Sequence, residues 1–226
     1  MLTRILVGTL LMAQPTPAAM HVEVRPAITV AVQGEDEVPA AEWSRARRLA
    51  TRILNRAGLA AIWESGTSCS PPALCLHLSR TRPATLHADA AGYAVLLPGA
   101  GHASVYLPGV ERTASQLGVD RATVLGAAMA HEIGHLLLGP AHSYGVMSTR
   151  FDRPQMRAAE RGELLFRDED ARRLQRLSGD RSPTGPGECN SPKQVTDCST
   201  NVSPARKSSI SCGERGSPVQ VDELHY

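Results

Sequence analysis

Two histidines and a glutamate stand at a spacing that suits metal-dependent hydrolysis, in the stretch His131-Glu132-Ile133-Gly134-His135. Residues four apart on a helix lie on the same face one turn apart, so the imidazoles of His131 and His135 can bind one metal ion. Glu132 lies beside that face, where its carboxylate can reach a zinc-bound water and take its proton. The pattern predicts a zinc site with a general base.

The residues around this motif predict that its helix is buried. Apolar side chains precede and follow the motif, at Leu125, Ala128, Met129 and residues 136–138. Two buried histidines beside a buried glutamate need polar partners, and a metal ion supplies one for all three. The alternative is a surface helix with solvated histidines.

A third candidate ligand follows the helix. Gly139 can end the helix with a positive φ, and Pro140 prevents its continuation. The chain then turns and presents His142, and Met147 follows five residues later. Three protein ligands with one open position describe a catalytic rather than a structural zinc site.

The motif, followed by Gly139, His142-Ser143 and Met147, resembles that of the metzincin zinc metallopeptidases, and most closely their matrixin-type branch. The resemblance implies that His131, His135 and His142 bind Zn²⁺ and that Glu132 is the catalytic base. It also implies that Met147 forms a hydrophobic floor below the metal. Substrate would lie extended along an edge strand, for which residues 103–107 are the candidate.

One spacing departs from the metzincin pattern. The third histidine of that clan usually follows the second by six residues, whereas His142 follows His135 by seven. Either the helix runs one residue longer or the turn is wider. In the gluzincin clan a downstream acid is the third ligand, so Glu160 and Glu163 are alternatives, although neither has the Glu-x-x-x-Asp spacing of that clan.

Hydrophobic periodicity predicts the elements that position these residues. Alternating or continuous apolar runs indicate strands over residues 27–32, 59–63, 74–78, 93–97 and 103–107. Helical spacing indicates helices over residues 42–57, from Asp120 to Leu138, and over residues 168–177. The expected fold is α+β and metzincin-like: a twisted mixed β-sheet packed with an N-terminal helix and an active-site helix, followed by a C-terminal helix.

The chain is expected to divide into three parts. A positive start, an apolar run and small residues over positions 1–19 are typical of a signal peptide, which implies secretion or a periplasmic location. Residues 20–178 form the predicted catalytic domain, and the Ser/Pro/Gly-rich residues 179–226 a disordered tail. In an oxidising compartment Cys69 and Cys75 could form a local disulfide, while the odd total of five cysteines leaves at least one free or paired between chains.

Composition narrows the class of protein. The 226 residues are 42% hydrophobic and 20% charged with a net charge of +2, which does not suggest a nucleic-acid-binding protein. No apolar run approaches the ~20 residues of a membrane-spanning helix. Other candidates for function are weaker: a loop tyrosine, three histidines on or beside strands and a basic helix face (Tyr144, His77, His87, His102, Arg45, Arg48, Arg52 and Arg56). Trp43 and Trp63 are expected in the core.

These observations favour a secreted zinc-dependent endopeptidase acting on a peptide or protein substrate. Two alternatives stay open. The first is a secreted binding protein that keeps the metal helix without catalysis, as the off-pattern spacing of His142 would allow. The second is a zinc hydrolase that cleaves another bond, because His-Glu-x-x-His alone does not choose the scissile bond.

Overall fold

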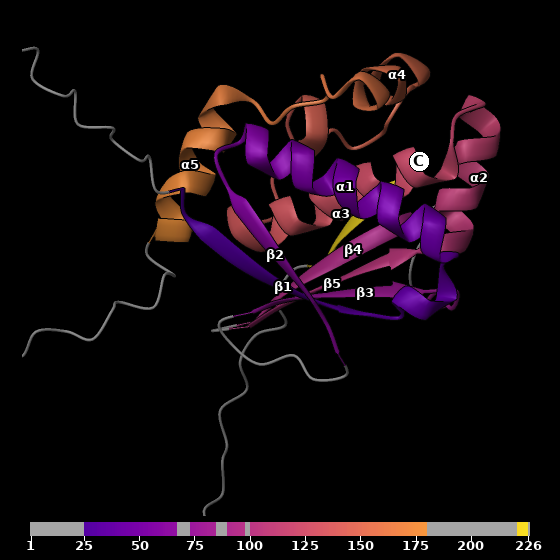
Figure 1. The fold of residues 1–226 in the computed structure, drawn as a ribbon, viewed down its shortest axis with the longest axis horizontal. Helices are drawn as coiled ribbons and strands as arrows, with labels where there is room; N and C mark the ends of the chain where they lie inside the picture. The colour runs from indigo at the N-terminus through magenta and orange to yellow at the C-terminus, as the bar shows by residue number, and fades with distance from the viewer. Residues whose placement is uncertain (1–24, 67–72, 85–89, 98–99, 180–220, 226) are drawn as a thin grey trace, which may run out of the picture.

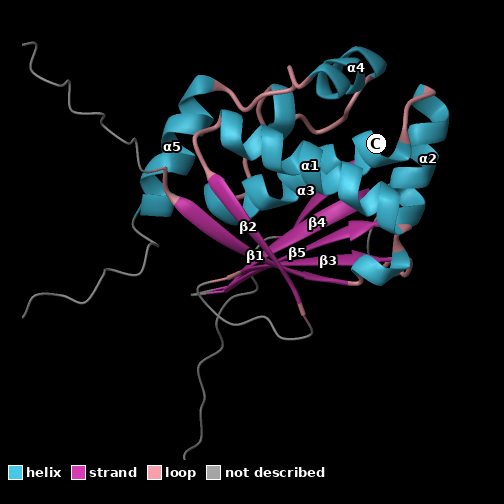
Figure 2. Cartoon of the chain, in the orientation of Figure 1, coloured by secondary structure: helices cyan, strands magenta, loops and turns pink. Residues whose placement is uncertain are grey.

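The computed structural model describes residues 25–66, 73–84, 90–97, 100–179 and 221–225. These residues form one mixed sheet with helices packed on it, which is an α+β fold (Figures 1 and 2). The predicted signal peptide, the Cys69 half of the predicted disulfide, His87 and most of the tail lie outside the described residues. Cys75 is disulfide-bonded, and its partner also lies outside them.

Six described strands form the sheet in the order β2-β1-β3-β5-β4-β6. The first four of these are parallel to one another, whereas β4 is antiparallel to both β5 and β6. The strands are β1 (Ala27–Gln33), β2 (Ala60–Ser65), β3 (Leu74–Ser79), β4 (Ala90–Leu97), β5 (Ala100–Tyr106) and β6 (Val221–His225). All five strands predicted from the sequence are present, with ends shifted by a few residues.

Helices account for most of the remaining described chain. The α-helices are α1 (Ala40–Arg56), α2 (Leu107–Leu117), α3 (Arg121–Leu138), α4 (Arg153–Arg161) and α5 (Asp168–Gly179), with short 3₁₀ helices η1 (Glu35–Glu37) and η2 (Gly145–Met147). The helix α1 connects the parallel strands β1 and β2, as a parallel pair requires. Among the described residues, no helix combines the length and apolar character needed to cross a membrane.

The helix α3 lies at the centre of the fold, between α1 and the sheet (Figure 1). Every residue from Ala122 to Leu138 is buried. At Gly126 the two helices approach so closely that a Cβ atom would lie 2.6 Å from the carbonyl oxygen of Ala46. A helix that is apolar on all sides belongs in a core, and the predicted burial of this helix is confirmed.

Two helices were not predicted, although both carry local signals. In α4, Asp152 forms a capping box with Gln155, and Pro154 lies in the first turn, where proline is favoured. In α2, Pro108 similarly lies in the first turn, and Gly118 ends the helix with a φ of 62°.

The prediction that residues 103–107 form an edge strand is wrong. The strand β5 is interior, because Leu76 of β3 and Ala94 of β4 both pair with its Ala103. The turn residues of the sequence after Leu97 indicate that the two strands pair, but they do not indicate which of the two lies further out. It is β4 that lies outside β5, and its outer edge pairs with β6.

Within the segment predicted to be disordered, residues 221–225 form β6. Their sequence has no strong strand signal of its own. The edge of β4 provides the backbone donors and acceptors with which β6 pairs, so the strand depends on a contact far away in the chain.

Candidate metal centre

The helix α3 positions the histidine motif. It begins at Asp120, whose Oδ1 accepts a hydrogen bond of 2.7 Å from the backbone N–H of Ala122, as predicted for an N-cap. It ends at Gly139, which has the predicted positive φ, of 89°. The helix therefore extends through Leu138, and the longer spacing between His135 and His142 is accommodated without moving His142 away.

Three histidines converge at the C-terminal end of α3. Ring centroids lie 4.5 Å apart for His131 and His135, 4.8 Å for His135 and His142, and 5.5 Å for His131 and His142. One ligand atom from each residue lies within 4.8 Å of the other two, which is close enough to hold a metal ion. The three residues named from the sequence as metal ligands are therefore brought together.

Backbone contacts set the orientation of two of these rings. The Nδ1 of His131 lies 2.7 Å from the carbonyl oxygen of Val146, and the Nδ1 of His135 lies 3.0 Å from that of Gly139. A carbonyl oxygen only accepts hydrogen bonds, so each Nδ1 carries the proton and donates it. In the neutral rings both Nε2 atoms are then unprotonated, with lone pairs available to a metal.

The two Nε2 atoms lie 2.8 Å apart. Two unprotonated nitrogens cannot form a hydrogen bond with each other, whereas a cation could accept the lone pairs of both. Burial, followed by the nearby His135 and with a smaller effect of His142, lowers the pKa of His131 well below its usual range. The three imidazoles form a donor set that fits a metal ion.

The carboxylate of Glu132 is fully buried between α3 and the sheet. A Cβ atom on Gly92 of β4 would lie only 2.2 Å from Oε1 of Glu132, so this carboxylate lies against the β4 backbone. The Glu132 charge also contributes to raising the pKa of Tyr106, after burial of that phenol and the effects of Tyr93. Gly92 was not identified from the sequence, because the predicted strand begins one residue later, at Tyr93.

Met147 packs against the helix beside the histidine motif. It is buried in η2, and a Cβ atom on Gly134 would lie 2.4 Å from its sulfur. Gly145 starts this turn with a φ of 71°, and a side chain there would collide with the carbonyl of Leu165. Gly134 and Gly145 thus allow the turn to pack directly on the helix between the two ligand positions.

The loop that carries His142 is held in place by two hydrogen bonds from Ser143. The backbone N–H of Ser143 donates to the carbonyl of Met147 over 2.9 Å. The hydroxyl of Ser143 donates to Oδ2 of Asp170 on α5 over 2.6 Å. The neighbouring Val146, which accepts from His131, is itself bonded through its N–H to the carbonyl of Leu165. Asp170 and Leu165 were not identified from the sequence, because neither belongs to a motif.

The alternative acidic ligands lie outside the histidine group. Glu160 forms an ion pair with Arg157 at 2.8 Å. Glu163 pairs with Arg161 at 2.7 Å, and the hydrogen bond from Arg161 lowers the pKa of Glu163. Tyr144 is 80% exposed, and His77 and His102 are exposed on strands.

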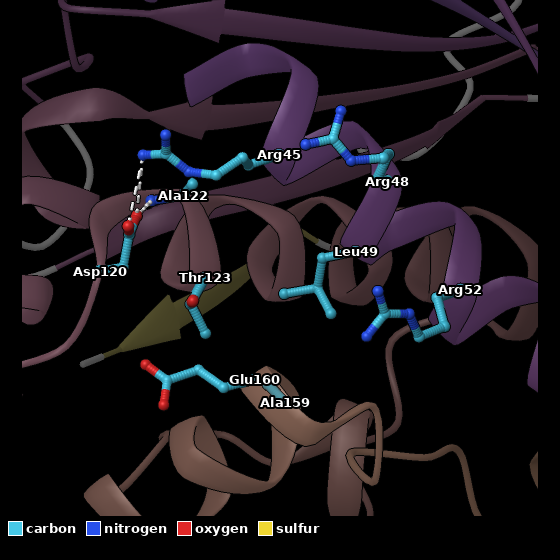
Figure 3. Close-up of a pocket in the computed structure, with 9 residues that line it drawn as sticks. All are labelled: Arg45, Arg48, Leu49, Arg52, Asp120, Ala122, Thr123, Ala159 and Glu160. Carbon is cyan, nitrogen blue, oxygen red and sulfur yellow. Dashed lines mark hydrogen bonds and ion pairs between the residues drawn. The ribbon is translucent and has the colours of Figure 1, made fainter. Parts of the chain in front are cut away.

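The basic face of α1 forms a separate hollow of about 360 Å³ bordered by the start of α3 and by α4 (Figure 3). Arg45 forms an ion pair with Asp120 at 3.3 Å, and Arg48 donates to Ser44. These contacts agree with a solvated helix face. Trp43 and Trp63 are partly buried against the core, edge to face at 6.3 Å.

Comparison with known proteins identifies no family for this chain. No family model matches the chain, and no curated protein matches it. A solved structure, the GM1-bound form of the ECX AB5 holotoxin, aligns with 69% of this chain and 80% of its own at 14% identity and a TM-score of 0.38. The site therefore stands on its own geometry.

Proposed function

We propose that the protein is a secreted zinc-dependent peptidase in which His131, His135 and His142 bind Zn²⁺ and Glu132 is the general base. The observation that supports this most is the paired orientation of His131 and His135. Each donates its Nδ1 proton to a backbone carbonyl, and their Nε2 atoms face one another at 2.8 Å. His142 completes a set of three imidazoles, a donor type that suits zinc.

Zn²⁺ held by His131, His135 and His142 would lower the pKa of a bound water and polarise the carbonyl group of a substrate. Glu132 follows His131 directly, and in this proposal its carboxylate accepts the proton of the attacking water. After attack, the same carboxyl group returns the proton to the leaving amine. Because the carboxylate is buried, it lies in a region of low dielectric constant, where the energy of a charge depends strongly on its distance from other charges.

The choice of a peptide as substrate rests on the resemblance to metzincins and on strand geometry. An extended peptide can add to the edge of a sheet through main-chain hydrogen bonds. Since β5 is interior, we assign this role to β4, whose outer edge pairs with β6 and whose Gly92 lies against the Glu132 carboxylate. A polypeptide docked on β4 would pass close to the general base.

Secretion is supported by two observations. Residues 1–19 have the charge, apolar run and small residues of a signal peptide. Cys75 is disulfide-bonded, and disulfides persist in oxidising compartments.

A second candidate is a metal-containing binding protein without catalysis. It is favoured by the burial of the site, because His131 and Glu132 are both 0% exposed and His135 is 3% exposed. A catalyst with this arrangement must open before substrate can reach these side chains.

The deciding experiment measures bound metal by mass spectrometry, together with hydrolysis of internally quenched peptides. The variants are His142→Ala, Glu132→Gln and, as a control, His102→Ala, which changes an exposed histidine outside the group. A peptidase binds one zinc per chain, loses it in His142→Ala alone, and loses hydrolysis but not zinc in Glu132→Gln. Zinc without hydrolysis in the wild type would favour the binding protein, and no metal in any variant would contradict both.

A further inference from the structure

The outer edge of β4 is occupied by a strand from the C-terminal part of the same chain (Figure 1, yellow). The segment Val221–His225 pairs antiparallel with β4, from Val221 opposite Val95 to His225 opposite Ala90. No other strand in the described part of the chain lies beyond β6. Without β6, β4 would be the edge of the sheet.

This pairing occurs at the part of β4 that contacts the candidate general base. Leu224 lies opposite Gly92, and Gly92 is the residue whose backbone lies against the Glu132 carboxylate. The register shifts between Ala90 and Gly92, so the irregularity in the pairing falls at the same place. An extended peptide that added to β4 here would need the backbone groups that β6 uses.

We infer that the outer edge of β4 is a docking surface for extended peptides and that residues 221–225 are its intramolecular occupant, which a peptide from outside must displace. The identification of the displacing peptide as a substrate rests on the proposed function. The occupancy of the edge by the chain's own segment rests on the strand pairing alone.

Covalent connection makes this occupant effective. A segment of the same chain competes as an intramolecular ligand, so its local concentration does not depend on how dilute the protein is. A five-residue strand nevertheless holds only a few hydrogen bonds to one neighbour, each contributing about 1 kcal/mol. We therefore expect residues 221–225 to bind β4 tightly enough to exclude weakly binding peptides, but weakly enough to be displaced by tighter ones.

Two proline variants of the full chain test this, Asp222→Pro and Glu223→Pro. Successive N–H groups of a strand point to opposite sides, so one substitution removes a donor facing β4 and places a ring against that strand. The other directs its ring away from the sheet and is the matched control. The readouts are hydrogen exchange of the amides of residues 90–97 and the hydrolysis rate of an internally quenched peptide library.

The expected result is faster exchange in β4 for one of the two variants only, by about fivefold or more, which corresponds to the loss of about one hydrogen bond. In the same variant kcat/KM rises by a similar factor, and a synthetic peptide of residues 219–226 added in trans lowers both. Wild-type exchange in both variants would overturn the inference. Faster exchange without any change in measurable hydrolysis would overturn the competition with substrate. If no form of the protein hydrolyses any peptide, the proposed function fails, and exchange with and without the added peptide still decides whether β6 occupies the edge.

Discussion

The position of the Glu132 carboxylate depends on a residue that carries no side chain. Gly92 leaves the space that Oε1 of Glu132 fills, since a Cβ atom there would lie 2.2 Å from that oxygen. The β4 backbone is held on both sides by β5 and β6, so it has little freedom to move away. A methyl group at this position must therefore displace the carboxylate.

Gly92→Ala is accordingly expected to lower kcat for peptide hydrolysis by about tenfold or more while leaving bound metal unchanged, because displacements near 1 Å at a catalytic group are costly. Steady-state kinetics and metal analysis measure the two effects. Gly66→Ala is the control, because a Cβ atom at Gly66 would meet nothing within 4 Å. Equal kcat in both variants would mean that Glu132 does not act from its observed position.

The histidines show what residue spacing alone can predict. The spacing of His131 and His135 specifies one face of a helix, and Gly139 and Pro140 specify where that helix ends, so the three converging histidines could be named. Their hydrogen-bond partners could not. Val146 accepts from His131 through its backbone carbonyl, which every residue has, and only the folded turn brings it within 2.7 Å.

At the scale of elements, the loop that carries His142 is positioned by α5. The hydroxyl of Ser143 donates to Asp170 over 2.6 Å, which connects the loop to the first turn of that helix. A ligand residue on a loop depends on such contacts to keep its direction, because loops are otherwise more mobile than the elements they join.

Asp170→Asn is therefore expected to weaken zinc binding by about tenfold, the lower end of the effect of residues that support a metal ligand. The matched control is Asp168→Asn, which removes an equal charge from the same first turn of α5. Competition with a chromophoric chelator gives both affinities. Equal weakening in the two variants would assign the effect to the charge of the helix terminus rather than to the contact with Ser143.

Arg121 of α3 connects three helices through ion pairs with α1 and α2. Arg121 donates from Nε and Nη2 to the two carboxylate oxygens of Glu42, each over 2.6 Å, and also pairs with Glu111 of α2. The hydrogen bond to Glu42 raises the pKa of Arg121 above its already high value. The Glu42 side chain is only 12% exposed, so this pair is better shielded from water than those at the surface.

Arg121→Lys keeps the charge but cannot form the paired contact, so it is expected to lower the free energy of unfolding by about 1–2 kcal/mol. Arg45→Lys changes the half-exposed pair with Asp120 in the same way and is expected to cost less than about 0.5 kcal/mol. Urea unfolding followed by circular dichroism compares them. A larger effect for Arg45→Lys would mean that the Arg45–Asp120 pair contributes more to stability than the Arg121–Glu42 pair, contrary to this prediction.

At the scale of the whole molecule, the sequence predicted the elements that depend on local patterns, but not the features that depend on pairing between distant segments. The alternation in residues 27–32 and the periodicity of α1 are properties of neighbouring residues, so these elements were identified correctly. The order of strands depends on pairing between distant segments, and residues 103–107 were wrongly placed at the edge for that reason. The strand β6 was missed for the same reason, since it forms by pairing with β4, which is distant in the sequence.

The stability of the whole fold is linked to one buried phenol at the end of β5. Tyr106 is 2% exposed and stacks on Tyr93 at 5.9 Å with the rings 5° from parallel. Burial, followed by the effects of Tyr93, raises the pKa of Tyr106 well above its usual range. The folded protein therefore holds this proton more tightly than the unfolded chain does, so unfolding releases a proton once the pH exceeds about 10, the ordinary pKa of tyrosine.

Because the proton is bound more tightly in the folded state, the contribution of Tyr106 to stability is complete below about pH 10 and is lost as the pH rises through the folded pKa. The free energy of unfolding should fall by up to about 1.4 kcal/mol per pH unit in that window. Tyr106→Phe should reduce this slope, whereas Tyr144→Phe, at a side chain 80% exposed, should leave it unchanged. Urea unfolding at several values between pH 8 and 11 gives the slopes. An equal alkaline slope in the wild type and in Tyr106→Phe would mean that the phenol ionises as readily in the folded protein as in the unfolded chain.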